Sequence, residues 1–256
     1  ISSEFRNNDT VINPKAIYLA VSQSGETADT ISAIKEIKLK GGQVFGVVNV
    51  VGSTIARLCG KGVYIHSGPE QSVASTKAFT NMVAALTIFA TQLGRTRHLS
   101  KDEGRELMQA LQQTPHLMET YLEDIGPIDE AVNLLCEANS VLFLGRGLSA
   151  TVAKEGALKL MELAYIPCLA YPAGEMKHGP IALLEEGSPV VVIAPNDHLK
   201  EKTMSALHEV KARGAKVILI HEQGDAIASE GDVSIAVPAV HPALTPLLTV
   251  LPLQLM

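Results

Sequence analysis

The feature that most constrains the fold of this chain is a pattern of strand, polar turn, helix, glycine and strand that occurs twice. The first copy covers residues 16–50 and the second covers residues 189–222. In each copy, apolar β-branched runs alternate with amphipathic helical stretches. A third short strand follows, at residues 62–66 and 233–237, and then an apolar helix, at residues 75–93 and from residue 241 onward. Continuous apolar strands connected through helices indicate a parallel sheet that is covered on both faces and wound by right-handed crossovers. We therefore expect an α/β protein built from two related halves.

The second half begins with more structure than the first. A strand, a Gly-Arg-Gly turn, a helix and another strand occupy residues 140–171, whereas the first half has only residues 1–14 in the same place. The sequence also begins without methionine and stops at Met256 within an apolar helical run. We therefore expect a fragment whose first domain has a further strand, turn and helix upstream of Ile1.

The stretch between the two halves is expected to be a helical linker. Residues 100–139 carry Glu, Lys, Gln and Leu at helical spacing and are divided into two helices near Gly126 and Pro127. The expected boundaries are residues 1–97 for the first domain, residues 98–127 for the linker and residues 128–256 for the second domain.

Composition and charge exclude several classes of protein. Hydrophobic residues make up 46% of the chain, charged residues make up 19%, and the formal net charge is −6 with no long basic run. These values indicate a well-packed protein that binds neither nucleic acid nor an anionic membrane surface. The three cysteines are far apart and lack metal-ligand spacing, which favours a reducing cytoplasm. The most apolar helical run, residues 78–93, is interrupted by Asn81 and is expected to be a core helix.

The first candidate site is the polar turn at residues 22–27, between an apolar run and a helical stretch. The N–H groups and the dipole at a helix N-terminus favour an anion there. Four side chains of the turn can donate hydrogen bonds, namely those of Ser22, Gln23, Ser24 and Thr27. The turn has no Lys or Arg, so a phosphate would be held by dipoles and hydroxyl groups. Taken alone, the turn is better explained as an ordinary N-cap with a capping box.

A second constellation lies on one helical face. Glu155, Lys159 and Glu162 stand at positions i, i+4 and i+7 of the stretch that follows the Gly-Arg-Gly turn. On spacing alone, a solvated stripe of ion pairs is the simpler explanation. However, four apolar residues lie in the same stretch, which indicates that part of the stripe is enclosed. An enclosed carboxylate would have a raised pKa and would be suited to proton transfer near neutral pH.

Two further segments carry candidate residues. His178 lies in a glycine-rich turn at residues 174–180, where a hydrogen-bonded loop histidine is the more frequent case. Val73 and Ser75 lie in a run of small and hydroxyl residues before a helix, and a plain N-cap at Ser75 explains that run equally well. Ligands of open parallel sheets bind beyond the carboxyl ends of the strands. Since the candidate turns all follow strands, we expect one cleft shared by the two halves.

Four motifs together resemble the isomerase portion of the glucosamine-6-phosphate synthase family, the glutamine:fructose-6-phosphate amidotransferases. These motifs are SQSGETADT at residues 22–30, VASTKAFT at residues 73–80, EGALKL at residues 155–160 and GEMKHGP at residues 174–180. The first is shared by many sugar-isomerase (SIS) domains, whereas the second and fourth in combination are much more specific. The resemblance extends along the whole chain. It implies two flavodoxin-like SIS domains, a homodimer, a phosphosugar site, no cofactor and a place in amino sugar biosynthesis.

The resemblance also implies a role for each candidate residue. The 6-phosphate of the sugar would be bound by the first turn, through Ser22, Gln23, Ser24 and Thr27. Val73 and Ser75 would contact the sugar. Glu162 would be the base that moves a proton between C1 and C2, and Lys159 would assist at the sugar oxygens. His178 would help to open the sugar ring in the site of the neighbouring subunit. Ketose-to-aldose isomerisation needs ring opening, a base and an anchor for the phosphate, and it needs no metal.

The chain also departs from the complete enzymes of that family. It has no counterpart of their N-terminal glutaminase domain, nor of the C-terminal tail whose lysine forms an imine with the open-chain sugar. Met161 stands where many relatives carry a lysine. We therefore expect no synthase activity from these residues alone. Two other functions stay open, namely a related SIS-domain sugar-phosphate deaminase or deglycase and a non-catalytic phosphosugar sensor.

Overall fold

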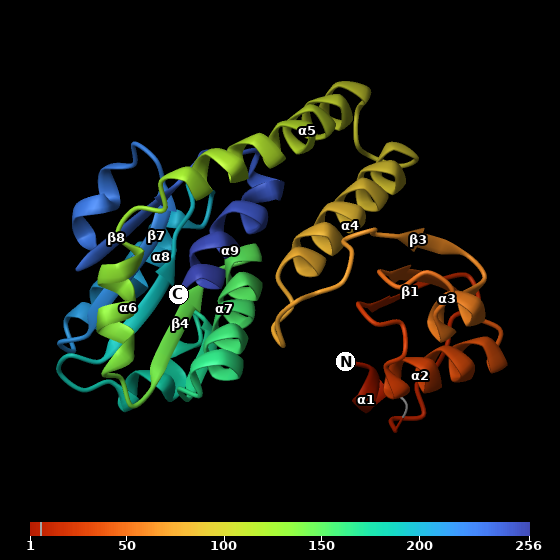
Figure 1. Cartoon of the computed structure of the whole chain (residues 1–256), viewed down its shortest axis with the longest axis horizontal. Helices are drawn as coiled ribbons and strands as arrows, with labels where there is room; N and C mark the ends of the chain where they lie inside the picture. The colour runs from red at the N-terminus through yellow and green to blue at the C-terminus, as the bar shows by residue number, and fades with distance from the viewer. Residues whose placement is uncertain (6) are drawn as a thin grey trace. The chain divides into compact units, whose positions relative to one another are not determined.

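The chain folds into two compact units in the computed structural model, which describes residues 1–5 and 7–256. The first unit is Ile1–Gly94 and the second is Arg95–Met256 (Figure 1). Each unit contains one parallel β-sheet with helices packed against it. This arrangement confirms the α/β class predicted from the repeat.

The first unit contains a three-stranded parallel sheet in the order β1-β2-β3. Its elements are α1 (Ser2–Phe5), β1 (Ile17–Ser22), α2 (Ala28–Leu39), β2 (Gln43–Val48), α3 (Thr54–Cys59), β3 (Gly62–Tyr64) and α4 (Lys77–Arg95). Ile34 and Ile37 recur at helical spacing on α2 and are buried together with Val48 of β2 and Ile55 of α3. The register pairs Ser22 with Val48, so the turn after β1 starts level with the end of β2.

The second unit contains a five-stranded parallel sheet in the order β5-β4-β6-β7-β8. Its helices and strands are α5 (Lys101–Glu123), α6 (Ile128–Cys136), β4 (Val141–Gly145), α7 (Leu148–Ala164), β5 (Cys168–Pro172), β6 (Pro189–Ile193), α8 (Lys200–Lys211), β7 (Lys216–Glu222), β8 (Val233–Val237) and α9 (Thr245–Leu255). It also contains the short 3-10 helices η1 (Met176–His178), η2 (Pro180–Leu183), η3 (Ala226–Glu230) and η4 (Pro242–Leu244). This strand order is that of flavodoxin, as the family resemblance implied.

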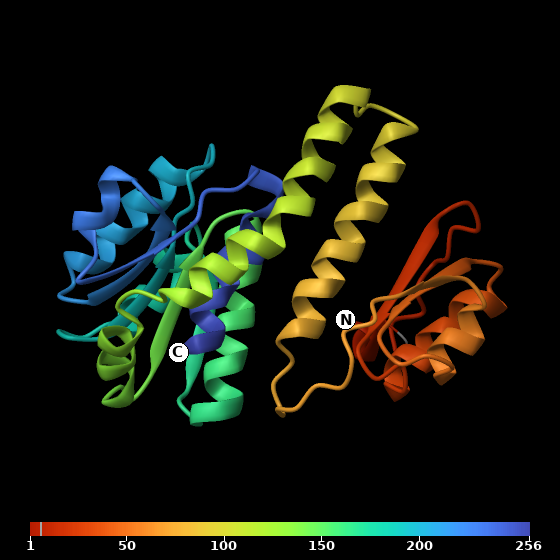
Figure 2. The same cartoon turned by 45° about the horizontal axis from the view of Figure 1, so that its top comes forward.

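Both faces of the second sheet are covered. Leu142 and Leu144 of β4 pack with Leu207 of α8, and the alternate residues Val141 and Phe143 are equally buried. Helices α7 and α9 pack against each other beside the sheet, as Figures 1 and 2 show. Because side chains alternate between the two faces of a strand, strands buried on both faces read as the continuous apolar runs seen in the sequence.

Strand β1 has a different environment from β6, which is its counterpart in the repeat. β6 pairs with both β4 and β7, whereas β1 pairs only with β2 among the described residues. Ile17, Leu19 and Val21 of β1 are exposed, while every residue of β6 is buried. Three of the five apolar residues of β1 are therefore exposed.

Most of the predicted elements are present, with shifted ends. Residues 100–139 form α5 and α6, which are separated by residues 124–127 as predicted; α5 lies within the expected linker and α6 within the expected second domain. The third strand was expected to reach residue 66 but ends at Tyr64, because His66 has a left-handed backbone with φ +51° that a strand does not accommodate. The helix expected from residue 75 begins at Lys77.

The apolar stretch at residues 78–93 lies within α4. In the part of the chain that the structure describes, no helix is both long enough and apolar enough to cross a membrane. Cys59, Cys136 and Cys168 are all free thiols.

Candidate functional site

The turn after β1 is organised by its own hydroxyl groups. Ser22 is buried, and its Oγ accepts the Gly25 N–H at 3.1 Å and lies 2.9 Å from Thr27 Oγ1. Ser24 Oγ accepts the Glu26 N–H at 3.2 Å. The two serines therefore fold the turn back on itself, and the exposed Ser24 and Thr27 side chains remain on its outer side.

Gly25 is required at this turn for two reasons. Its φ of +67° lies in the left-handed region, and a Cβ at this position would come within 2.0 Å of Ser53 Oγ. The carbonyl of Gly25 also accepts the N–H of Ile55 in α3 at 2.9 Å. The turn is thus packed tightly against the start of α3.

The ordinary capping box considered for this turn is wrong. Thr27 is the N-cap residue of α2, but its side chain makes no cap hydrogen bond. Glu26 turns away from α2 and accepts the Thr54 N–H at 2.7 Å, and this hydrogen bond holds the pKa of Glu26 below its ordinary value. The hydroxyl of Thr27 pairs with Ser22 instead, so the polar groups of the turn shape the loop rather than cap the helix.

A cavity of about 770 Å³ opens beside this turn within the first unit. Its lining includes three of the predicted residues, Gln23, Val73 and Ser75, together with Asn49 and His66. Ser22, Ser24 and Thr27 do not line it. The structure therefore brings part of the first turn and the second donor segment together at the carboxyl end of one sheet.

Glu70 is a residue of this region that the sequence pattern did not reveal. Its Oε1 accepts the Ala78 N–H at 2.8 Å, the Thr76 N–H at 3.2 Å and the Ser75 hydroxyl at 3.4 Å. Glu70 therefore caps the start of α4, and the plain N-cap at Ser75, which explained the sequence equally well, is wrong. No local spacing rule connects an acid to a helix seven residues further along, so only the folded loop shows this role.

The charged residues of α7 form a partly buried cluster in the second unit. Lys159 is only 4% exposed, and its Nζ lies 3.3 Å from Glu155 Oε1 and 3.1 Å from Glu162 Oε2. The side chain of Glu155 is 15% exposed and that of Glu162 is 34% exposed. The solvated ion-pair stripe is therefore wrong for Lys159 and Glu155. Burial raises the pKa of Glu155 although Lys159 lowers it, so the enclosed carboxylate expected from the sequence is Glu155.

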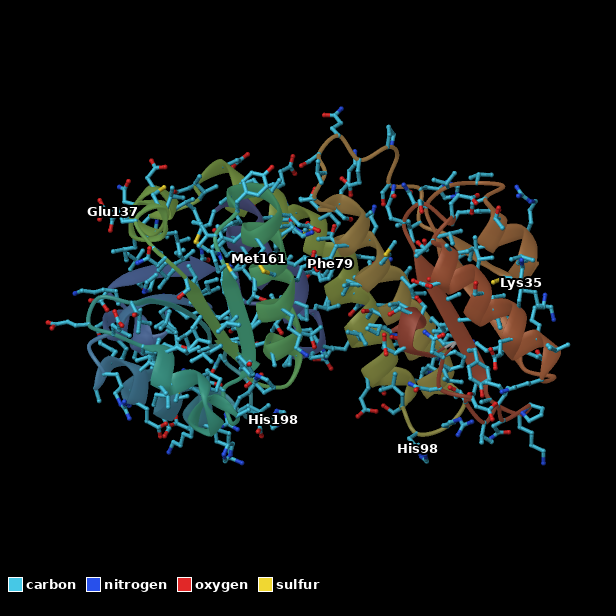
Figure 3. All side chains as sticks on the ribbon, turned by 90° about the horizontal axis from the view of Figure 1, so that it is seen from below. Lys35, Phe79, His98, Glu137, Met161 and His198 are labelled. Carbon is cyan, nitrogen blue, oxygen red and sulfur yellow. The ribbon has the colours of Figure 1, made fainter. Side chains whose placement is uncertain are left out.

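Met161 lies on the same helix and is partly exposed (Figure 3). Its thioether can neither neutralise a carboxylate nor bind an anion as a lysine at this position would.

His178 lies on a separate segment of the second unit, at the end of η1 after β5. Its backbone N–H donates to the Glu175 carbonyl oxygen at 3.0 Å, and its side chain is exposed. Met176 anchors the segment because its side chain is fully buried in the core on the α8 face. Within residues 1–5 and 7–256, no hydrogen bond to the imidazole of His178 is present, so the ring is not the hydrogen-bonded loop histidine considered above.

The fold and these polar turns together define one class of protein. Comparison with known sequences identifies that class. A family model described as "SIS domain" matches residues 1–92 and 134–256. The chain belongs to the SIS domain family.

Within that family, the chain is similar over its whole length to one enzyme. It is 47% identical to the glutamine–fructose-6-phosphate aminotransferase [isomerizing] of Thermus thermophilus, of which it covers 43%. It also matches the solved C-terminal domain of glucosamine-fructose-6-phosphate aminotransferase from Francisella tularensis, with a TM-score of 0.93, 37% identity, and coverage of 100% of this chain and 73% of that one. These matches confirm the resemblance inferred from the four motifs.

A more distant structure shares only the fold. Glucosamine-6-phosphate deaminase from Thermotoga maritima aligns over 99% of this chain and 72% of its own, with a TM-score of 0.76 and 19% identity. The chain spans about 43% of the length of the curated relatives that it matches. The activity of the complete enzymes is therefore a matter of proposal for this chain.

Proposed function

We propose that this chain is the isomerase part of a glutamine–fructose-6-phosphate aminotransferase. It binds fructose 6-phosphate and isomerises the aminated ketose to glucosamine 6-phosphate. The observation that carries this proposal is the 47% identity along the entire chain. The polar cavity in the first unit and the buried charge cluster on α7 support it, because they supply an anchor for a sugar phosphate and a base.

The phosphate is held by the turn after β1. Ser22, Gln23, Ser24 and Thr27 provide hydroxyl and amide donors there, and the N-terminal end of α2 adds its dipole. A dianion held by neutral donors exchanges water hydrogen bonds for protein hydrogen bonds, so affinity depends on how well the donors are pre-positioned. Val73 and Ser75, which line the neighbouring cavity, contact the sugar itself.

Proton transfer is assigned to Glu162. In the imine that amination forms at C2 of the ketose, the carboxylate takes a proton from C1, and the C1–C2 double bond forms as the C2=N π electrons move to the nitrogen, which takes up a proton. C2 then receives a proton from Glu162 while the C1 hydroxyl releases its own, which leaves the aldehyde of glucosamine 6-phosphate. Glu162 is the more accessible carboxylate of its cluster, so it can reach a substrate while Lys159 holds it in place. The ammonium group of Lys159 stabilises negative charge that develops at the sugar oxygens.

Ring opening is assigned to His178, whose exposed imidazole has both ring nitrogens available for proton transfer. We propose a homodimer in which His178 serves the site of the partner. We also propose a cytoplasmic location, supported by the three free thiols. The proposed domain limits remain residues 1–97, 98–127 and 128–256, and no cofactor is required.

The proposal is tested by substitution in the complete protein from which this sequence comes. Glu162→Gln keeps the size of the side chain and removes the base, so it abolishes isomerisation while affinity for fructose 6-phosphate stays within about tenfold. Equal loss of both would show that Glu162 is structural. Ser24→Ala combined with Thr27→Ala raises the KM, and an unchanged KM would remove these residues from the phosphate site.

The two alternative functions give different products in the same assay. Release of ammonia from an aminosugar phosphate, without glutamine-dependent synthesis, would identify a deaminase or deglycase. Binding of fructose 6-phosphate without any conversion would identify a sensor. The 256-residue chain alone is expected not to make glucosamine 6-phosphate from glutamine, and robust turnover by it would contradict that expectation.

A further inference from the structure

Asn49 connects three parts of the first unit that follow successive strands. It comes directly after β2 and is only 8% exposed. Its backbone N–H donates to the Gln23 carbonyl oxygen at 3.3 Å, in the turn after β1. Its side chain reaches the segment after β3, where Oδ1 accepts the Ser67 N–H at 2.8 Å and Nδ2 donates to the Gly68 carbonyl oxygen at 2.7 Å. One amide side chain therefore satisfies two adjacent backbone groups.

The backbone that Asn49 holds has an unfavourable conformation. His66 has φ +51° and Gly68 has φ +68°, so two left-handed residues flank Ser67. A residue with a Cβ rarely adopts this region, and such a conformation persists only where its surroundings impose it. Asn49 pairs with the Ser67 N–H between the two left-handed residues and with the Gly68 carbonyl oxygen directly after them, so it stabilises the left-handed part of this loop.

The same loop forms one wall of the candidate cavity. Gln23 and Asn49 line that cavity together with seven members of the loop, namely His66, Gly68, Pro69, Glu70, Ser72, Val73 and Ser75. The side chain of Val73 is largely exposed, so its own packing does not position it. The position of this wall relative to the phosphate-binding turn therefore depends on the hydrogen bonds at its two ends, which are made by Asn49 at the start and by Glu70 near Ser75.

We propose that Asn49 is a positioning residue of the sugar-phosphate site. It holds the segment that carries Val73 and Ser75 at a fixed distance from Gln23, so that a ligand meets both at once. The identity of that ligand rests on the function proposed above, whereas the positioning role rests on the hydrogen bonds alone.

A positioning role and a merely structural role have different kinetic consequences. If Asn49 only stabilised the fold, its removal would lower the melting temperature and the fraction of active protein and leave the KM unchanged. If it positions the cavity wall, the KM for fructose 6-phosphate rises while the kcat of the folded protein changes little.

The test is Asn49→Ala in the complete protein, measured as KM, kcat and melting temperature. Loss of two hydrogen bonds of ordinary strength predicts a rise in KM of about tenfold, with kcat within about threefold. Asn81→Ala is the matched control. Asn81 Nδ2 donates to Ser67 Oγ at 2.7 Å in the same loop, but Asn81 does not line the cavity. The control is expected to change the KM by less than about twofold.

Asn49→Leu provides a second variant, because it keeps nearly the same volume, adds no charge and removes both side-chain hydrogen bonds to the loop. It is expected to raise the KM as well. An unchanged KM in both variants would overturn the proposal.

Amide hydrogen exchange tests the proposal without any substrate. Residues 65–76 are expected to exchange faster in Asn49→Ala than in the wild type, and equal protection would overturn the positioning role. Failure of the wild-type protein to convert fructose 6-phosphate would instead count against the proposed function. It would not affect the test of the positioning role, since the exchange measurement does not depend on catalytic activity.

Discussion

Replacing Lys159 with methionine removes the cation from a cluster that is otherwise acidic. Lys159 is 4% exposed and lies within 3.3 Å of Glu155 and 3.1 Å of Glu162. Methionine is about as long as lysine but is uncharged, so the substitution leaves the volume of the side chain on α7 nearly unchanged. The main consequence is that Glu155 remains largely buried beside another carboxylate with no positive partner.

The cost of this change is limited by protonation of Glu155. Breaking a buried ion pair by removing one partner costs about 3–5 kcal/mol. Glu155 can instead take up a proton, and this alternative costs about 1.4 kcal/mol for each pH unit above 4.5, the ordinary pKa of a glutamate side chain. The free energy of unfolding that the variant can lose through Glu155 is therefore limited to about 5 kcal/mol at pH 8 and about 0.7 kcal/mol at pH 5. Glu162 is about one-third exposed, and its contribution is screened by solvent.

The stability of the variant should consequently depend on pH. Burial raises the pKa of Glu155 in the folded state, so the folded chain binds more protons than the unfolded chain above pH 4.5. The free energy of unfolding therefore falls as the pH rises above 4.5, and it falls by more when Lys159 is absent. We expect Lys159→Met to lose about 3 kcal/mol at pH 8 and about 1 kcal/mol or less at pH 5.

Urea denaturation of the 256-residue chain, followed by circular dichroism at pH 5, 6.5 and 8, measures this difference. Lys216→Met is the matched control, because Lys216 forms a 3.0 Å ion pair with Asp232 but is half exposed. The control is expected to lose less than about 1 kcal/mol at each pH. An equal loss at pH 5 and pH 8 for Lys159→Met would show that Lys159 does not neutralise a buried carboxylate.

Three further outcomes follow from the described contacts. Gly25→Ala is expected to destabilise the first unit by about 2–4 kcal/mol, because the new Cβ would sit 2.0 Å from Ser53 Oγ at a positive φ; a change in thermal unfolding below about 0.5 kcal/mol would contradict this. Glu70→Ala removes the acceptor of three donors and should cost about 1–2 kcal/mol and speed amide exchange at the start of α4, whereas unchanged exchange would argue against the cap. Titration of the native chain with a thiol reagent at pH 8 should label the exposed Cys136 first, because burial raises the pKa of Cys168 to about 11, and two rapidly reacting thiols would disprove this.

The parallel sheets were predictable because their signal is local. Apolar runs such as 189–193 and the helical spacing of Ile34 and Ile37 reflect burial on known faces of a strand or helix. The position of the polar turn after β1 could be predicted for the same reason, since it depends on a strand end, hydroxyl residues and a glycine that are adjacent in the chain. Only the ends of elements moved, as at β3, where His66 adopts a left-handed backbone.

Properties that depend on contacts across the chain were not predictable. The spacing of Glu155, Lys159 and Glu162 placed them on one face of a helix, but it did not distinguish a solvated stripe from a buried cluster. That distinction depends on how β4, β5 and α9 pack around α7, because burial is a property of the neighbours and not of the helix itself.

The amino-acid order alone thus established the α/β class, the duplicated halves and the chemical character of each candidate turn, because these follow from residues within one or two turns of one another. The folded chain decided which polar groups meet. Asn49 reaches Ser67 and Gly68, which lie nearly twenty residues further along the chain, and Glu70 caps a helix across a loop. Hydrogen bonds of this kind form only when the ends of neighbouring strands are brought to one edge of a sheet, and no periodicity in the chain encodes them.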